Sequence, residues 1–179
     1  MTEGRDWFEV VSSAHCADCG FDAATLTDDA IAAELRRVAH EWVTLLATTA
    51  DTRLPRRPAP AVWSALEYGA HVRDTIAVFD ARIGLALVED EPELGWWDHE
   101  AAVITERYNA QEPATVSRSL VANATALAER LDAVHHDAWA RVATRRGTER
   151  FTVDGLGRFV LHEAQHHLRD ARISARVAR

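Results

Sequence analysis

The chain has 179 residues, of which 47% are hydrophobic and 27% charged, a composition typical of one globular domain. All 20 basic residues are arginine, yet the formal net charge is −8, which argues against a nucleic-acid-binding surface. No apolar run approaches the roughly 20 residues of a membrane-spanning helix, and the acidic start Met1–Asp6 does not resemble a secretory signal. We therefore expect a cytoplasmic protein without nucleic-acid or membrane partners, formed by one domain over residues 1–179 with an N-terminal extension at 1–26.

Apolar residues at spacings of three and four predict the first two long helices. The first is expected to start at the cap Thr27. Its apolar face consists of Ile31, Leu35, Val38, Trp42, Leu45 and Leu46. The proline-rich stretch 54–60 ends it and serves as a connector. Ser64 and Glu67 form a capping-box sequence, which opens a second helix that runs to about Glu89.

The second half of the chain is also helical in pattern. A short helix is expected at about 99–109, and Pro113 suits the first turn of a fourth helix that reaches about Val134. The arginine-rich stretch 140–151 predicts a long loop or a short hairpin, and the last helix starts near 152–154. No longer strand-like alternation is present. The fold class is therefore all-α, an up-and-down four-helix bundle with a short additional helix and a loop before the last helix.

Histidines on the second and last helices are the candidate metal ligands. His162 and His166 are four residues apart, so their imidazoles share one helix face and can reach one ion. His71 lies near the second turn of the second helix, and facing helices of a bundle can project ligands into a shared core. The alternative is ordinary structure, because the chain has 9 histidines and a pair at this spacing also arises by chance.

Two segments resemble the DinB family, also described as DinB/YfiT-like metalloenzymes. They are Trp63–Asp74, with His71, and His162–Asp170, which supplies a His-x-x-x-His pattern. The resemblance spans about 30–175. It implies a bundle with a longer connection between its halves and a histidine-rich site for zinc, nickel or a similar divalent ion.

Carried over position by position, the resemblance gives the three ligand roles to His71, His162 and His166. Relatives include transferases and isomerases that use the thiols bacillithiol or mycothiol, and in some of them the second ligand is a carboxylate. The resemblance therefore implies a metal-dependent S-transferase or isomerase that uses a low-molecular-weight thiol and a small electrophilic substrate. It leaves open whether the protein is a homodimer.

Two other functions compete with thiol transfer. His162-Glu163-Ala164-Gln165-His166 also satisfies the H-E-x-x-H pattern of zinc peptidases, in which Glu163 would be the general base. That class needs a further ligand downstream, yet no His, Cys or Glu follows His167. A hydrolase with metal-bound water and Glu163 as base is one alternative, and a non-catalytic or dimerising metal-binding bundle is another.

Several residues near these motifs have open roles. Cys16 and Cys19 have the spacing of half a zinc site or a redox pair, but a tight turn closed by Gly20 is the simpler interpretation. Asp74 and Asp170 are placed either to orient a ligand histidine or to pair with the adjacent arginine. His167 is about 100° around the helix from His166, so we expect it to point elsewhere. Trp96 and Trp97 are expected either in a substrate cavity or in the core.

Overall fold

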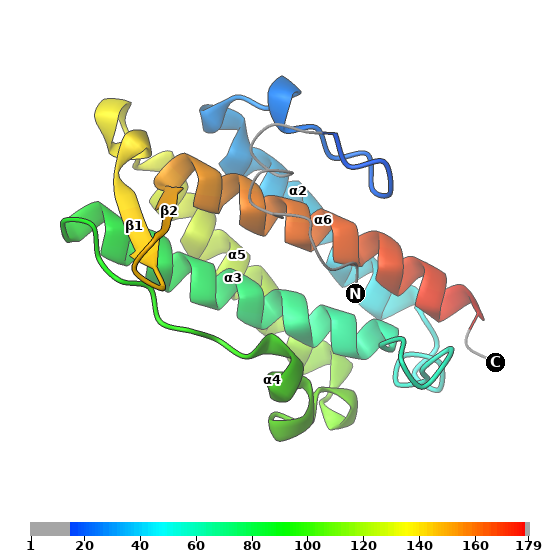
Figure 1. The fold of residues 1–179 in the computed structure, drawn as a ribbon. Helices are drawn as coiled ribbons and strands as arrows, with labels where there is room; N and C mark the ends of the chain where they lie inside the picture. The colour runs from blue at the N-terminus through cyan, green and yellow to red at the C-terminus, as the bar shows by residue number, and fades with distance from the viewer. Residues whose placement is uncertain (1–14, 178–179) are drawn as a thin grey trace.

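The computed structural model describes residues 15–177, and four long helices dominate it (Figure 1). The main elements are α2 (Ile31–Thr48), α3 (Ala65–Val88), α4 (His99–Thr105), α5 (Pro113–Asp132), β1 (Val142–Arg145), β2 (Glu149–Thr152) and α6 (Val153–Val177). Short 3-10 turns lie at Ala23–Thr25, Asp28–Ala30, Tyr108–Ala110 and His136–Ala140. The predicted helical bundle with a short additional helix is confirmed. Met1–Asp6 and the rest of residues 1–14, most of the expected extension, lie outside the described residues.

The helix starts show how the sequence specifies the elements. Ser64 Oγ accepts a hydrogen bond from the Glu67 backbone N–H at 3.1 Å, and the Glu67 carboxylate accepts one from the Ser64 N–H at 2.8 Å. This confirms the capping box at the start of α3. The start predicted at Thr27 is wrong: its side chain makes no capping hydrogen bond, and α2 begins at Ile31. A 3-10 turn intervenes, in which Asp28 pairs with Arg158 at 2.6 Å.

The two middle helices of the bundle, α3 and α5, run in the same direction (Figure 1). Asn123 of α5 donates to the carbonyl oxygen of Arg73 at 2.9 Å, and Arg130 pairs with Asp80 at 2.6 Å, so the contacts advance together along both helices. Helices α2 and α6 run the opposite way. The connection 89–112 must therefore return along the bundle, and it is the longer connection that the family resemblance implies.

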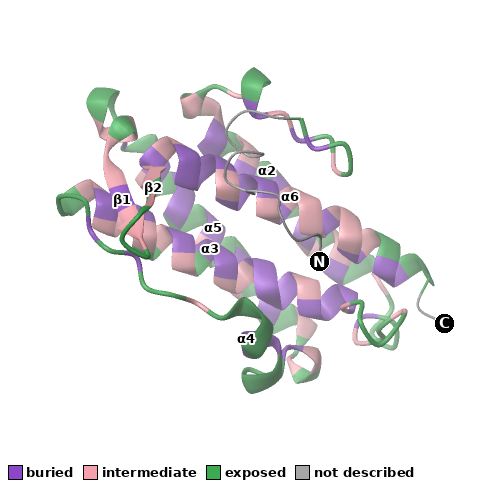
Figure 2. Cartoon of the chain, viewed as in Figure 1, coloured by how far each residue is buried: buried purple, intermediate pink, exposed green. Residues whose placement is uncertain are grey.

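The core lies between the four long helices, where each turns its buried face inward (Figure 2). Trp42 is fully buried on α2 and donates its indole N–H to the carbonyl oxygen of Ala164 at 3.0 Å. This bond joins α2 to the turn of α6 that carries the candidate ligands. Near the end of α6, Ser174 and Ala175 are still buried, whereas Ile173 lies on the outer face and is 43% exposed.

The stretch 140–151 contributes a short hairpin, which is one of the two predicted alternatives. Val142 pairs with Thr152 and Arg145 with Glu149, in antiparallel register. The three residues Arg146, Gly147 and Thr148 connect the strands, and Arg146 and Gly147 have positive φ angles of 53° and 73°. The hairpin was not visible as alternation because each strand has only four residues. It places several arginines at one end of the bundle.

The described helices include none with both the length and the apolar character needed to cross a lipid bilayer.

Candidate functional site

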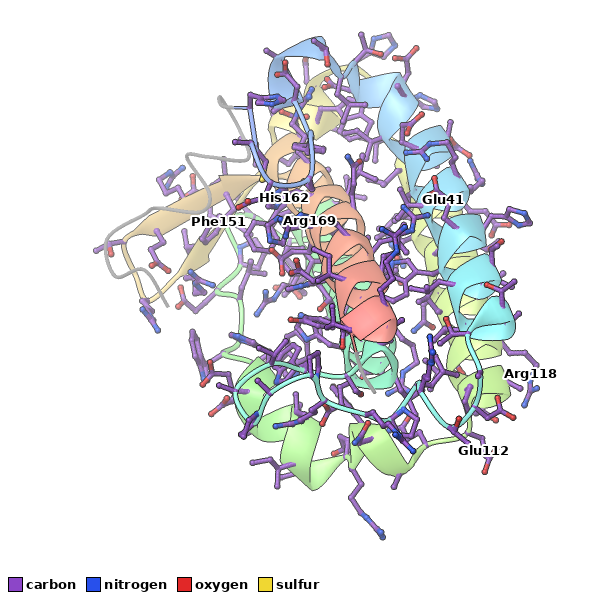
Figure 3. All side chains as sticks on the ribbon, turned by 90° about the vertical axis from the view of Figure 1, so that its right-hand side faces the viewer. Glu41, Glu112, Arg118, Phe151, His162 and Arg169 are labelled. Atoms are coloured by element: carbon purple, nitrogen blue, oxygen red, sulfur yellow. The ribbon has the colours of Figure 1, made fainter. Side chains whose placement is uncertain are left out.

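One turn of α6 carries four possible metal ligands, and the bundle divides them between two faces. His162 and His166 share one face, while Glu163 and His167 share the next, because consecutive helical residues are about 100° apart. Viewed from the side in Figure 3, His162 lies toward the same side of the bundle as Phe151 of β2. Each pair meets different partners from other parts of the chain, which gives two groups that could hold a metal ion.

The first group joins α3 to α6 and is called here the carboxylate cluster: His71, Glu163 and His167. Each residue offers a ligand atom, and the three atoms lie within 4.8 Å of one another. The Glu163 carboxylate oxygen Oε2 lies 3.4 Å from His167 Nε2 and 4.0 Å from His71 Nε2. The imidazole rings of His71 and His167 are 5.0 Å apart between centroids. Two imidazoles and a carboxylate form a donor set suited to zinc and related ions.

Aromatic and polar neighbours hold the carboxylate cluster in place. Trp97 stacks on His71 at 5.8 Å with its plane inclined by only 6°. Asp170 Oδ2 lies 3.4 Å from Nδ1 of His167, so this carboxylate supports the ring from the side away from Glu163. His71 Nδ1 is buried and has no hydrogen-bond partner within residues 15–177. The rings are therefore fixed before any ligand enters.

Without a metal, His167 at the centre of the carboxylate cluster is protonated. Burial by itself would lower the pKa of His167, but hydrogen bonds to Asp170 and Glu163 outweigh it and raise this pKa to about 9. Burial would raise the pKa of Glu163, but the hydrogen bond with His167 and the neighbouring imidazoles lower it to about 2. Burial and the charge of His167 lower the pKa of His71 to about 3. His71 is thus neutral at pH 7, and a Glu163–His167 ion pair stands beside it.

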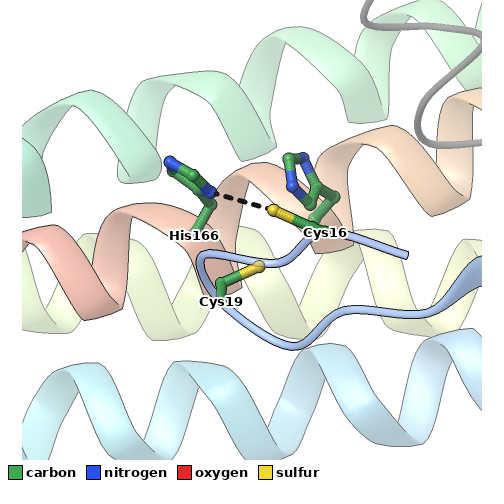
Figure 4. A group of neighbouring side chains, drawn as sticks. Cys16, Cys19 and His166 are labelled. Carbon is green, nitrogen blue, oxygen red and sulfur yellow. Dashed lines mark hydrogen bonds between the residues drawn. The ribbon is translucent and has the colours of Figure 1, made fainter. Parts of the chain in front are cut away.

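The second group joins the N-terminal loop to α6 and is called here the cysteine cluster: Cys16, Cys19, His162 and His166. The Cys16 sulfur lies 3.6 Å from Nδ1 of His166, and one ligand atom of each residue lies within 4.8 Å of the others. Figure 4 shows the Cys16 sulfur pointing at His166, with Cys19 on the same loop beside it. The predicted tight turn is confirmed, since the Gly20 N–H donates to the Cys16 carbonyl at 2.8 Å and Gly20 has a φ of +77°.

The predicted ligand set His71, His162 and His166 is divided between the two clusters. The structure groups His71 with Glu163 and His167, and it groups His162 and His166 with the cysteines. The reason is the rotation of α6, which turns the Glu163 and His167 face toward α3. Helical spacing fits both pairs equally well, and the carboxylate ligand of some relatives was the available signal for Glu163. Asp74 pairs with Arg73 at 2.7 Å, as one alternative predicted. Asp170 meets both alternatives, since it pairs with Arg169 at 2.8 Å and also contacts His166 and His167.

The carboxylate cluster opens on a cavity of about 550 Å³ at the hairpin end of the bundle. His71 and Glu163 form part of its wall. Trp96 and Trp97 also line it, so of the two predicted positions, cavity or core, they occupy the cavity. Its wall also includes Phe79, Phe151, Phe159, Arg82, Arg145, Arg146 and Arg150. Arg145 pairs with Glu149 and Arg150 with Glu91. Within residues 15–177, Arg82 and Arg146 have no ion pair with a carboxylate, so the cavity keeps unbalanced positive charge.

These features define the class as a four-helix bundle whose helices bring histidine and carboxylate side chains to the wall of a cavity. The family model described as DinB superfamily matches residues 34–171, and the chain therefore belongs to the DinB superfamily. This confirms the resemblance found in the sequence. A comparison with curated proteins gives no match.

A solved structure supports the same fold. The chain is similar to YfiT from Bacillus subtilis, described as a probable metal-dependent hydrolase with an unusual four-helix bundle topology. The TM-score is 0.78 at 17% sequence identity, and the match covers 93% of this chain and 97% of YfiT. At this identity the similarity establishes the fold alone.

Proposed function

We propose that this protein is a divalent-metal-dependent enzyme that acts on a small anionic molecule, with His71, Glu163 and His167 as the metal ligands. The observation that carries the proposal is the position of the carboxylate cluster in the wall of a cavity. Its donor atoms lie close together, and His167 Nε2 is 3.4 Å from Glu163 Oε2. Imidazole and carboxylate donors suit zinc or nickel. The cavity volume is in the range of small-molecule sites.

Three protein ligands leave coordination positions free, which suits catalysis better than a structural role. A bound divalent ion would supply Lewis acidity, lowering the pKa of a coordinated thiol or water so that a nucleophile is available at neutral pH. The protein itself contributes the orientation of the ligands through Asp170 and Trp97. The aromatic wall offers an apolar surface, and the arginines attract an anionic substrate.

The cavity arginines point to the charge of the substrate. The overall charge of −8 gives no sign of a polyanionic substrate, but the hairpin concentrates positive charge locally. Arg146 lies over the Trp96 ring at 4.7 Å, and Arg82 lies over Phe79 at 5.1 Å. A guanidinium held in this way can bind a carboxylate in bidentate fashion. We infer a substrate with at least one carboxylate next to an apolar part.

Thiol transfer or thiol-dependent isomerisation is the leading reaction class. It is supported by the carboxylate in the proposed ligand set, since the family resemblance includes thiol-dependent relatives with that ligand. Metal-dependent hydrolysis is the second candidate, supported by the description of YfiT. In that case Glu163, as a ligand, is a poor choice of general base. His99 is the better one, because it lines the cavity with its ring 5.7 Å from His71.

The test uses cobalt as a spectroscopic substitute in a variant that lacks both cysteines, Cys16→Ser with Cys19→Ser. We expect one cobalt ion per chain, and a thiolate charge-transfer absorption when a low-molecular-weight thiol is added. Glu163→Gln and His167→Ala in this background should lose the ion, whereas Glu149→Gln, a control in the same cavity, should keep it. Cobalt binding that survives both ligand substitutions would contradict the proposal. A spectrum unchanged by thiols, together with ester hydrolysis, would favour the hydrolase.

A further inference from the structure

The N-terminal loop and α6 together form a second candidate centre that the proposed function does not use. We propose that the cysteine cluster, Cys16, Cys19, His162 and His166, binds a zinc ion as a closed structural site. Two thiolates and two imidazoles complete a tetrahedral set, which leaves no position for a substrate. The sequence alone shows only a C-x-x-C pair, and the fold supplies its other half from residues almost 150 positions later.

The spacing of the ligand atoms fits zinc. Zinc–sulfur bonds of about 2.3 Å and zinc–nitrogen bonds of about 2.0–2.1 Å at tetrahedral angles separate a sulfur from a nitrogen by about 3.5 Å. The Cys16 sulfur and His166 Nδ1 are 3.6 Å apart. All four ligand atoms lie within 4.8 Å of one another, so small side-chain movements suffice to close the site.

The loop that carries the cysteines is already ordered against α6. The Cys16 N–H donates to the Phe21 carbonyl at 2.8 Å, and this bond together with the Gly20 turn curls the two cysteines around one point. The Gln165 side chain donates to the Cys19 carbonyl at 3.2 Å. Phe21 is buried and meets the His162 ring edge-on at 5.3 Å between centroids. These contacts hold the loop against α6 at the place where the four ligand atoms converge.

The outer contacts of the cysteine cluster also suit a metal site. Asp170 Oδ2 lies 3.5 Å from Nε2 of His166, which leaves Nδ1, the atom facing Cys16, as the ligand nitrogen. His162 is only 1% exposed and Cys16 7%, while Cys19 and His166 are partly buried. Thiolate ligands favour zinc over magnesium or calcium. On binding, each thiol loses its proton to solvent and both sulfurs bind as thiolates.

A zinc ion in the cysteine cluster would also affect the carboxylate cluster. The ion would fasten the loop 15–26 to α6 and fix the turn His162–His166. Of the proposed ligands of the carboxylate cluster, Glu163 lies within that turn and His167 directly follows it. A structural zinc site therefore holds α6 in the rotation that directs these two residues toward α3.

The test is the cobalt spectrum of the full-length protein without added thiol. We expect an intense thiolate-to-cobalt charge-transfer absorption that Cys16→Ser and Cys19→Ser each remove. His15→Ala, an exposed histidine beside Cys16, serves as the control and should retain it. In wild-type protein loaded with zinc, both cysteines should resist alkylation until a chelator is added. Absence of the absorption, or thiols that react equally fast with and without zinc, would overturn the proposal.

The two proposals fail separately. If only the cysteine site is wrong, the thiolate absorption is absent, yet Glu163→Gln still removes one metal ion per chain. If only the enzymatic site is wrong, the absorption persists and Glu163→Gln leaves the metal content unchanged. The alkylation measurement on the wild type decides the case even if the cysteine variants fold poorly.

Discussion

The rings of His166 and His167 are 5.7 Å apart and nearly perpendicular, at 87°, so two consecutive residues of α6 face two different ligand clusters. Asp170 contacts both of them, with distances of 3.5 Å to His166 Nε2 and 3.4 Å to His167 Nδ1. One carboxylate thus orients a histidine in each cluster. A change at Asp170 would therefore affect both proposed sites.

Substitution of Asp170 should weaken both sites together. Asp170→Asn removes the negative acceptor that sets the ring orientation of His166 and His167, and loss of such an outer partner reduces metal affinity by about 10- to 100-fold. Competition with a chromophoric chelator measures both affinities. Asp132→Asn, which breaks an exposed ion pair between α5 and Arg36 of α2, is the control and should leave both affinities unchanged. An effect of Asp170→Asn on neither site would show that this contact has no orienting role.

The metal-free protein should show an unusually basic histidine. In chelator-treated protein we expect an imidazole that titrates near pH 9, assigned to His167 by its loss in His167→Gln, because its proton is shared with Glu163 and Asp170. NMR titration of the ring protons measures this directly. A midpoint near the ordinary value of 6.5 would contradict the arrangement.

The same proton makes stability depend on pH. Because the folded pKa of His167 is raised, its contribution to the free energy of unfolding is complete below about pH 6.5 and is lost as the pH rises through about 9. Urea unfolding of the metal-free protein at several pH values should therefore show declining stability across this range. His167→Gln should flatten that slope.

The cavity arginines should determine substrate affinity. Arg146→Ala is expected to weaken binding of a small aromatic carboxylate by about tenfold or more, because a charge-assisted hydrogen bond contributes about 1.5–3 kcal/mol. Isothermal titration calorimetry with benzoate as the probe measures the change. Arg118→Ala, at an exposed position of α5 away from the cavity, is the matched control (Figure 3). Equal binding by both variants would remove the hairpin from the proposed binding site.

The contact between α2 and α6 should be important for stability. Trp42→Phe removes buried ring volume and the hydrogen bond to the Ala164 carbonyl, and we expect a loss of about 1–3 kcal/mol in the free energy of unfolding. Urea unfolding measures it. Val88→Ala, at a side chain that is 78% exposed, should change stability by less than about 0.5 kcal/mol.

The sequence predicted the long helices well because their apolar residues recur with the helical period. Leu35 and Trp42 are buried where that pattern places them. The start of α2 was less predictable, because Asp28 pairs with the distant Arg158 and a 3-10 turn precedes the helix. Such a contact has no local signal.

The candidate site was only partly predictable for a related reason. His162/His166 and Glu163/His167 have the same spacing, and only the packing of α6 against α3 decides which pair joins His71. The pairing of Cys16 with His166 spans 150 positions, and the cavity arginines come together only because the hairpin folds over the end of α3. These relationships arise from tertiary structure, which local periodicity does not encode.

The most direct measurement is a crystal structure of the zinc-loaded protein with anomalous scattering recorded at the zinc edge. We predict a peak bonded to His71, Glu163 and His167 at about 2.0–2.2 Å, the usual length of zinc bonds to nitrogen and oxygen. A peak bonded to His71 together with His162 and His166, or no peak beside His71, would contradict the central claim.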